Sequence, residues 1–158
     1  TPRTLFPYTT LSDLTRLEQA HECGNYEALL DLIPYAKLIG IECTRIGDEL
    51  LFRLPANKDN IGNPILPALH GGVIAGFMEL CAALHLLVFT GAPGLPKIID
   101  FSLDYLRAGQ FRDTYAKCQV WRQGRRVANV AITAWQTTAA EPIATARAHF
   151  KIEEVPRP

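Results

Sequence analysis

The sequence lacks an excess of charge of either sign, since its 16 Lys and Arg residues are matched by 16 Asp and Glu residues. A balanced chain has no overall electrostatic attraction for nucleic acid or for an acidic membrane surface, so neither partner is expected. Cysteine is also scarce. The 4 cysteines include no Cys-x-x-Cys pair, and no His stands at zinc-ligand spacing from two of them, so no metal site is predicted and free thiols in a reducing compartment are expected.

No charged and then apolar leader opens the chain, and we find no internal repeat and no low-complexity tract. We therefore expect a cytoplasmic protein with one folded core, for which 158 residues are sufficient. One apolar run, from residue 73 to residue 89, approaches the length of a membrane span. Because Glu79 and His85 lie within this run, a buried core helix is favoured over a span.

The apolar run stands at the centre of the predicted fold. A broken helix or two short helices over residues 12–33, ended by Pro34, precede a strand hairpin over residues 38–54. A turn-rich loop over residues 55–69 leads to a helix of about five turns that starts at His70. Strands with alternating apolar and polar residues follow at residues 99–105, 114–123, 126–138 and 143–152.

A helix that is apolar on every side must be covered over most of its surface. A curved antiparallel sheet is the element that this chain has available to cover it. The predicted fold class is therefore α+β, with a sheet of about six strands wrapped around one long central helix.

Glu79 is the only carboxylate between Asp59 and Asp100, and it lies in the middle of the apolar helix. An unpaired carboxylate in an apolar core is costly or acquires a raised pKa. Such a residue either faces a partner, a wet cavity or a substrate, or it is an ordinary buried Glu bonded to backbone or placed at a subunit contact. The residue type alone leaves both interpretations open.

His70, Gly71 and Gly72 lie at the start of the same helix, where free backbone N–H groups and the positive end of the helix dipole point outward. Two glycines let a ligand approach closely, as binding of a carbonyl oxygen that becomes an oxyanion requires. On its own, the tripeptide could equally serve close packing.

The combination resembles the hotdog thioesterases of the phenylacetate-degradation type, in the superfamily of 4-hydroxybenzoyl-CoA thioesterase. In that family His-Gly-Gly opens the central helix and an acid follows nine positions after the His, as Glu79 does here. Residues 98–109, 121–126 and 143–152 are similar to the family's second strand, Gly-Arg hairpin and final strand. The resemblance implies a hotdog domain at residues 34–158 after an N-terminal helical extension at residues 1–33.

Two positions depart from the family pattern. The acid is more often Asp, and Glu is usual in the sister branch that acts on hydroxybenzoyl-CoA. The family also has an Asn about six residues before the His, whereas Asn63 stands seven residues before His70.

The resemblance implies hydrolysis of acyl-CoA thioesters, with coenzyme A as part of the substrate and no cofactor. The backbone N–H of Gly72, with that of Gly71, would polarise the thioester carbonyl. Glu79 would activate water or attack to form an anhydride, and His70 would position the substrate or hold the turn. Predicted substrate-binding residues are Asn63, Arg107, Arg125 and Arg126, the arginines as candidates to hold the phosphates of coenzyme A.

Gly72 and Glu79 lie ~10.5 Å apart along the helix axis, so one thioester cannot easily reach both. The resemblance implies that the site is completed across a two-fold axis, in a homodimer or a dimer of dimers. A hotdog dehydratase or hydratase and a non-catalytic acyl-CoA-binding protein are the alternatives. The acyl group stays open, although Phe77, Met78 and Tyr105 are candidates to line its pocket.

Overall fold

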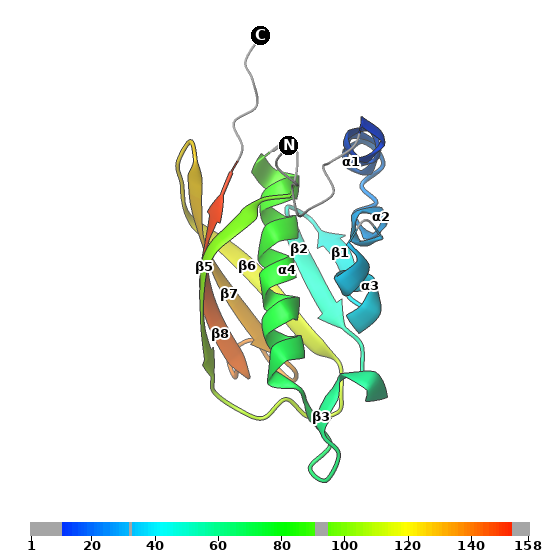
Figure 1. Cartoon of the computed structure of the whole chain (residues 1–158), viewed down its shortest axis with the longest axis vertical. Coiled ribbons are helices and arrows are strands. Elements are labelled where there is room, and N and C mark those ends of the chain that lie inside the picture. Colours follow the sequence, from blue (N-terminus) through cyan, green and yellow to red (C-terminus); the bar gives the residue numbers. More distant parts are fainter. Residues whose placement is uncertain (1–10, 32, 91–94, 153–158) are drawn as a thin grey trace, which may run out of the picture.

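The computed structural model describes residues 11–31, 33–90 and 95–152 (Figure 1). Three helices come first: α1 (Leu11–Cys23), α2 (Glu27–Leu30) and α3 (Pro34–Ile39). Of the two expected arrangements, a broken helix or two short helices, the structure has separate helices α1 and α2, and the break between them contains Gly24 with φ 66°, in the left-handed region that glycine adopts readily. Helix α2 ends at Leu30, so the expected helix end before Pro34 is confirmed. The expected strand start at residue 38 is wrong, because Pro34 opens α3, which runs to Ile39, at a first helical position that needs no N–H donor.

Six strands form one antiparallel sheet in the order β1-β2-β6-β7-β8-β5. These strands are β1 (Glu42–Ile46), β2 (Glu49–Leu54), β5 (Lys97–Tyr105), β6 (Thr114–Gln123), β7 (Val127–Trp135) and β8 (Ala144–Lys151). The loop predicted after β2 contains further structure, namely η1 (Lys58–Asn60) and a small hairpin of β3 (Ile61–Asn63) and β4 (Ala68–Leu69). These short strands are not predicted from the sequence, because the prolines and asparagines around them favour turns.

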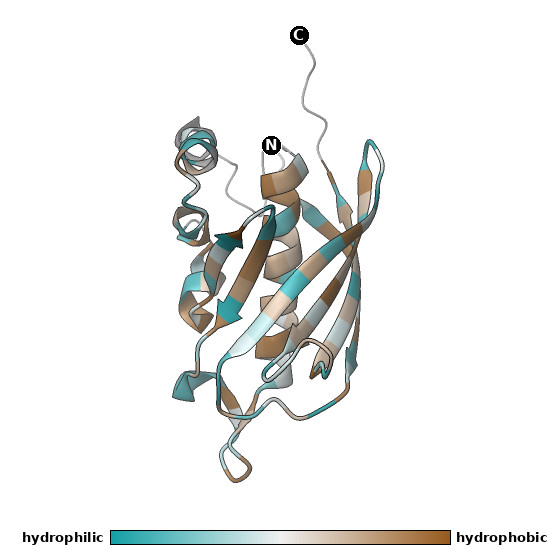
Figure 2. Ribbon diagram, turned by 180° about the vertical axis from the view of Figure 1, so that it is seen from behind, coloured by the Kyte–Doolittle hydropathy of each residue, from teal (hydrophilic) through white to brown (hydrophobic). Residues whose placement is uncertain are grey.

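Helix α4 (Gly71–Thr90) lies in the curve of the sheet (Figure 1). It is long and apolar enough to cross a membrane by length and composition, but 56% of its most apolar window is buried inside the protein. Ten of its residues are buried, and Phe77 and Met78 are among those with no exposed surface. Figure 2 shows apolar segments along α4 and along the strands that cover it. The prediction of a buried core helix within a hotdog arrangement is confirmed.

Strand β5 forms one edge of the sheet and pairs with β8 along its length. Phe101 and Leu103 pair opposite the buried Ala148 and Ala146, so they belong to the face that carries α4. The alternation of apolar and polar residues over 99–105 would place Ile99 on this same face, but it does not lie there, because the register shifts between Ile98 and Asp100. Ile99 stands at this irregularity and is 56% exposed.

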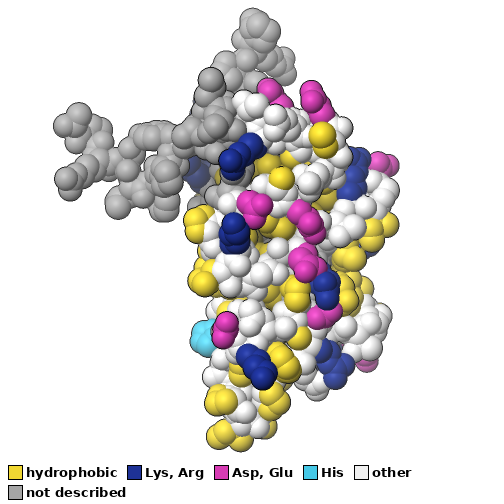
Figure 3. Space-filling view, turned by 90° about the vertical axis from the view of Figure 1, so that its right-hand side faces the viewer, with side chains coloured by type: hydrophobic (Ala, Val, Ile, Leu, Met, Phe, Trp, Pro, Cys, Tyr) yellow, Lys and Arg dark blue, Asp and Glu magenta, His cyan; other side chains and the backbone are white. Residues whose placement is uncertain are grey.

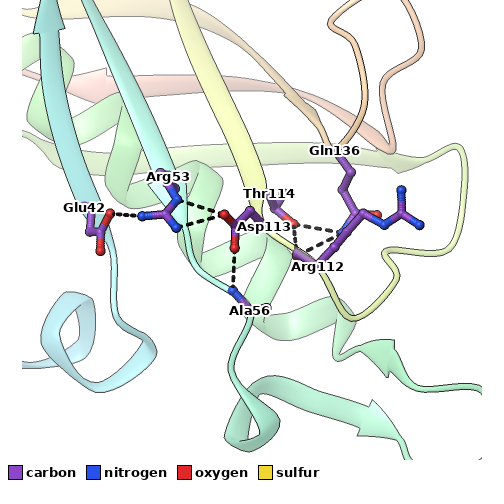
Figure 4. A network of polar contacts seen from close by, with 7 residues as sticks. All are labelled: Glu42, Arg53, Ala56, Arg112, Asp113, Thr114 and Gln136. Atoms are coloured by element: carbon purple, nitrogen blue, oxygen red, sulfur yellow. Dashed lines mark hydrogen bonds and ion pairs between the residues drawn. The ribbon is translucent and has the colours of Figure 1, made fainter.

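Arg53 of β2 joins three parts of the chain (Figure 4). Its Nη1 donates to Glu42 Oε2 at 2.6 Å, and its Nε and Nη2 donate to Asp113 Oδ2 at 3.0 and 2.8 Å. Asp113 Oδ1 also accepts a hydrogen bond from the Ala56 N–H at 3.0 Å. Because Arg53 bonds two carboxylates at once, this network contributes more to the stability of the fold than an isolated surface ion pair does. The network fixes the start of the loop that leads to His70.

Candidate active site

His70 is the residue before the first turn of α4, and both its backbone and its ring are bonded. The His70 N–H donates to the Asn60 carbonyl at 2.9 Å, and His70 Nδ1 accepts from the Gly72 N–H at 2.9 Å. An accepting Nδ1 carries no proton, so the neutral ring has its proton on Nε2. His70 therefore acts as a cap of the helix and occupies the Gly72 donor that the sequence favours for the carbonyl oxygen.

Gly71 offers the other donor of the helix start. Among the described residues, no acceptor bonds to the Gly71 N–H. The carbonyl of Gly71 accepts from Tyr105 Oη at 2.6 Å, so the end of β5 holds the first turn of α4 in place. A Cβ atom at Gly71 would lie 3.0 Å from Tyr105 Oη, which leaves little room for a side chain. The free donor at this site is thus Gly71.

Glu79 is partly buried, and burial raises the pKa of its carboxyl above the usual value of 4.5. Within the described part of the chain, the carboxylate makes no hydrogen bond and no ion pair. A carboxylate that is poorly solvated and unpaired is a stronger base than one in water. This side chain is suited to accept a proton.

Gly72, Gly76 and Glu79 fall within an arc of about 60° around α4 at 100° per residue. Gly72 is exposed and the other two are partly exposed, so the sheet leaves this arc uncovered. Phe77 and Met78 project into the core instead, which contradicts their proposed place in an acyl pocket. Tyr105 is 53% exposed beside Gly71 and is the one of the three that lies at the site.

A single protomer does not bring the helix start and the acid together, because Gly71 and Glu79 are ~12 Å apart along the helix axis. A carbonyl group bonded to the Gly71 N–H would therefore lie about two helical turns from Glu79 of the same chain.

The predicted substrate-binding residues are dispersed in the protomer. Asn63 Oδ1 accepts from the N–H groups of Ile65 and Leu66 at 3.0 and 3.3 Å, so this side chain stabilises the β3–β4 turn. Arg107 lies two residues after Tyr105, and its Nη1 donates to the Pro142 carbonyl at 2.6 Å.

Arg125 and Arg126 lie at the other end of the sheet. The Arg126 carbonyl accepts from the Ile152 N–H, beside the strand end where Lys97 pairs with Lys151. Strand β5 then runs about 26 Å from Lys97 to Tyr105 at ~3.3 Å per residue. Of the three arginines, only Arg107 is therefore near the helix start of its own protomer.

Two supporting residues were missed by sequence reasoning. Tyr105 was recognised as a pocket candidate but not as a hydrogen-bond donor to the helix start, since its partner lies 34 residues away. Asn60 is 3% exposed, and its Nδ2 donates to the Ile39 carbonyl at 2.9 Å while its own carbonyl holds His70. The same loop contains three asparagines, and the sequence does not indicate which of them is buried.

A surface hollow of about 500 Å³ lies between α2, α3 and β1. Its charged lining residues are Glu27, Asp31, Lys37 and Glu42, and none of the predicted site residues borders it. Figure 3 shows the side of the molecule that carries these helices, where acidic and basic side chains are mixed. Such a lining does not fit an apolar acyl group. No cluster that could hold a metal ion occurs among the described residues.

Comparisons with known proteins agree with this architecture. The model of the thioesterase superfamily matches residues 66–143, which include the helix start and Glu79. A crystal structure of a Chromobacterium violaceum protein is 41% identical, with a TM-score of 0.74, and the match covers 89% of this chain and 98% of that chain.

Two more distant structures share the fold. A phenylacetic acid degradation-related protein from Ralstonia eutropha is 19% identical with a TM-score of 0.68, over 80% of this chain and 98% of its own. Mouse thioesterase superfamily member 2 is 14% identical with a TM-score of 0.68, over 81% and 95%. Among curated protein sequences, none matches this chain.

Proposed function

Because the chain belongs to the thioesterase superfamily, we propose that it hydrolyses acyl-CoA thioesters to a free acid and coenzyme A. The observation that carries this proposal is Glu79, a partly buried carboxylate without a partner in the described chain, on the uncovered face of the helix. A helix start with a free N–H group supplies the second requirement of acyl transfer, a donor for the carbonyl oxygen.

In the proposed reaction the Gly71 N–H polarises the thioester carbonyl. Water attacks the carbonyl carbon as the Glu79 carboxylate takes its proton, and the resulting oxyanion stays bonded to the N–H. The carbon–sulfur bond then breaks, and the leaving thiolate receives the proton from Glu79.

A second route uses the same groups. Glu79 attacks the carbonyl carbon directly, the thiolate of coenzyme A leaves, and water opens the mixed anhydride to regenerate the carboxylate. Both routes need an ionised Glu79 and a donor for the oxyanion.

His70 is assigned a positioning role in both routes. Its Nδ1 holds the Gly72 N–H, which leaves the Gly71 N–H directed at substrate. Tyr105 fixes the carbonyl of the same residue from the other side. The two bonds orient the donor without contacting the reacting carbon.

The proposed site requires two copies of the chain, one supplying Gly71 and the other Glu79. Strand β5 is an edge of the sheet that the described strands form, and apolar side chains along and beside it are exposed: Ile98, Ile99, Tyr105 and Leu106. Such an edge is a template for pairing with a second chain. In an antiparallel β5–β5 pair, Arg125 and Arg126 of each protomer would approach the partner's helix start and could there bind the phosphates of coenzyme A.

The dimer can be tested with two matched lysines. Ile99→Lys places a charge on the proposed pairing edge, and Ile46→Lys places one on β1 at the opposite edge, with exposures of 56% and 59%. We expect Ile99→Lys to sediment as a monomer and to lose activity, while Ile46→Lys remains a dimer. Unchanged sedimentation of both variants would contradict pairing through β5.

The activity is tested by thiol release from a panel of straight-chain and aryl acyl-CoAs. We expect at least one to be hydrolysed, and we expect Glu79→Gln to lower kcat by about 10²-fold or more while the fold is retained. Hydrolysis by Glu79→Gln within about threefold of wild type would make Glu79 a structural residue. Absence of thiol release from the whole panel would favour a dehydratase or an acyl-CoA-binding protein.

A further inference from the structure

Tyr35 of α3 stands against the uncovered face of α4. A Cβ atom at Gly76 would lie 2.6 Å from Tyr35 Cε1, 3.0 Å from Oη and 3.2 Å from Cζ. The outer edge of the phenol ring thus touches the helix backbone, and the close approach requires glycine at this position. The buried residues of α3, Ala36 and Ile39, anchor the short helix that carries the ring.

The ring borders the part of α4 that carries Glu79. Gly76 precedes Glu79 by three residues, which is ~4.5 Å along the axis and 60° around it. The ring is therefore within one helical turn of the carboxylate, on the side of α4 that faces α3. Tyr105 stands beside Gly71 on the other side, toward β5.

Tyr35 is not a closed part of the core. It is 41% exposed, and within the described residues its hydroxyl makes no hydrogen bond. A ring held on a glycine but open on its other face has surface available to a ligand that lies along α4. Removing it would leave a trough, because Gly76 has no side chain to fill the space.

We infer that Tyr35 is a specificity-determining residue, whose ring edge forms the wall of the acyl pocket next to Glu79 and limits the bulk of the acyl group. This inference rests on the proposed function. The wall and Glu79 belong to the same chain, whereas the Gly71 N–H of the proposed site comes from the partner chain.

Binding of non-hydrolysable coenzyme A thioethers tests the wall without requiring catalysis. We would measure by calorimetry the Kd values of a small S-ethyl-CoA and a bulky S-(naphthylmethyl)-CoA. Tyr35→Ala should shift the ratio of the two Kd values at least about tenfold in favour of the bulky ligand, and Tyr35→Phe should leave it within about threefold. Leu38→Ala is the matched control, since Leu38 lies on the same short helix and is 74% exposed.

An unchanged ratio in Tyr35→Ala, an equal change in Leu38→Ala, or no thioether binding by the wild type would each overturn the inference. A changed ratio in a protein that hydrolyses no acyl-CoA would support the wall and refute the proposed function.

The contact between Tyr35 and Gly76 can be tested separately by thermal unfolding. Gly76→Ala should raise Tm more in the Tyr35→Ala background than in the wild type, because the added methyl then meets no ring; equal effects in both backgrounds would overturn the inference.

Discussion

Glu79 combines its proposed catalytic role with a cost to stability. Its carboxylate is partly buried, and burial raises its pKa because the charged form loses solvation. The folded state therefore binds a proton at Glu79 more tightly than the unfolded chain does. The stabilisation from this proton is fully present below the unfolded pKa of ~4.3 and is lost as pH rises through the higher folded pKa. At neutral pH the ionised carboxylate destabilises the fold.

Glu79→Gln should consequently have a higher Tm than the wild type at pH 7, since the amide has no charge to bury. The difference in Tm should shrink as pH falls through the pKa of Glu79 and should nearly vanish below ~pH 4. Thermal unfolding monitored by circular dichroism across this range measures it. Glu141→Gln removes an exposed carboxylate and should show no such trend. A difference in Tm that does not depend on pH would mean that burial of the ionised Glu79 carboxylate does not destabilise the fold.

At the residue scale, the sequence identifies Glu79 and the His-Gly-Gly tripeptide as candidate site residues. Glu79 stands out among apolar neighbours, and the tripeptide stands directly before the apolar run. It does not show that His70 Nδ1 bonds the Gly72 N–H or that Tyr105 bonds the Gly71 carbonyl. The first depends on the rotamer of His70. The second depends on where β5 ends relative to α4, which is a property of the tertiary structure.

The elements of the chain were predicted where a period is long and strong. Helix α4 and strands β6 to β8 lie close to their expected ranges, because apolar residues repeat over eight or more positions in each. The errors fall where one residue decides the geometry. Pro34 can end one helix or begin the next, and the irregularity at Ile99 changes which residues of β5 face α4.

The first turn of α4 offers a test of the donor with a matched control. Gly71→Ala adds a Cβ atom beside Tyr105 and keeps the N–H, whereas Gly71→Pro adds the Cβ atom, closes it into a ring through Cγ and Cδ, and removes the N–H. Proline is tolerated at the first helical position, so the helix should form in both variants. We expect Gly71→Pro to have a kcat about 10²- to 10³-fold below that of Gly71→Ala, as for loss of one oxyanion donor.

Circular dichroism and Tm of the two variants would confirm that they fold alike. Equal kcat values for the alanine and proline variants would exclude the Gly71 N–H as the donor. The role would then pass to the Gly72 N–H, which would have to exchange its bond with His70 for one with substrate.

For the whole molecule, the sequence predicts that a sheet must wrap α4, but it does not predict the strand order. Strand β5 leaves its neighbours in the chain and pairs with β8, at one edge. Pairing over such separations is set by the closure of the sheet around the helix, not by local pattern. The same topology explains why Arg125 and Arg126 lie at the end of the protomer away from Gly71.

The completed site can be tested by mixing two inactive variants. In a two-fold dimer each site would take Gly71 from one chain and Glu79 from the other, so a hybrid of Gly71→Pro and Glu79→Gln has one intact site and one site with both defects. Random reassociation of equal amounts makes half of the dimers hybrids and should restore about a quarter of wild-type activity. Co-refolding followed by an acyl-CoA hydrolysis assay measures this, with each variant refolded alone as the control. A site contained within one chain would give no recovery, because neither variant then has both groups.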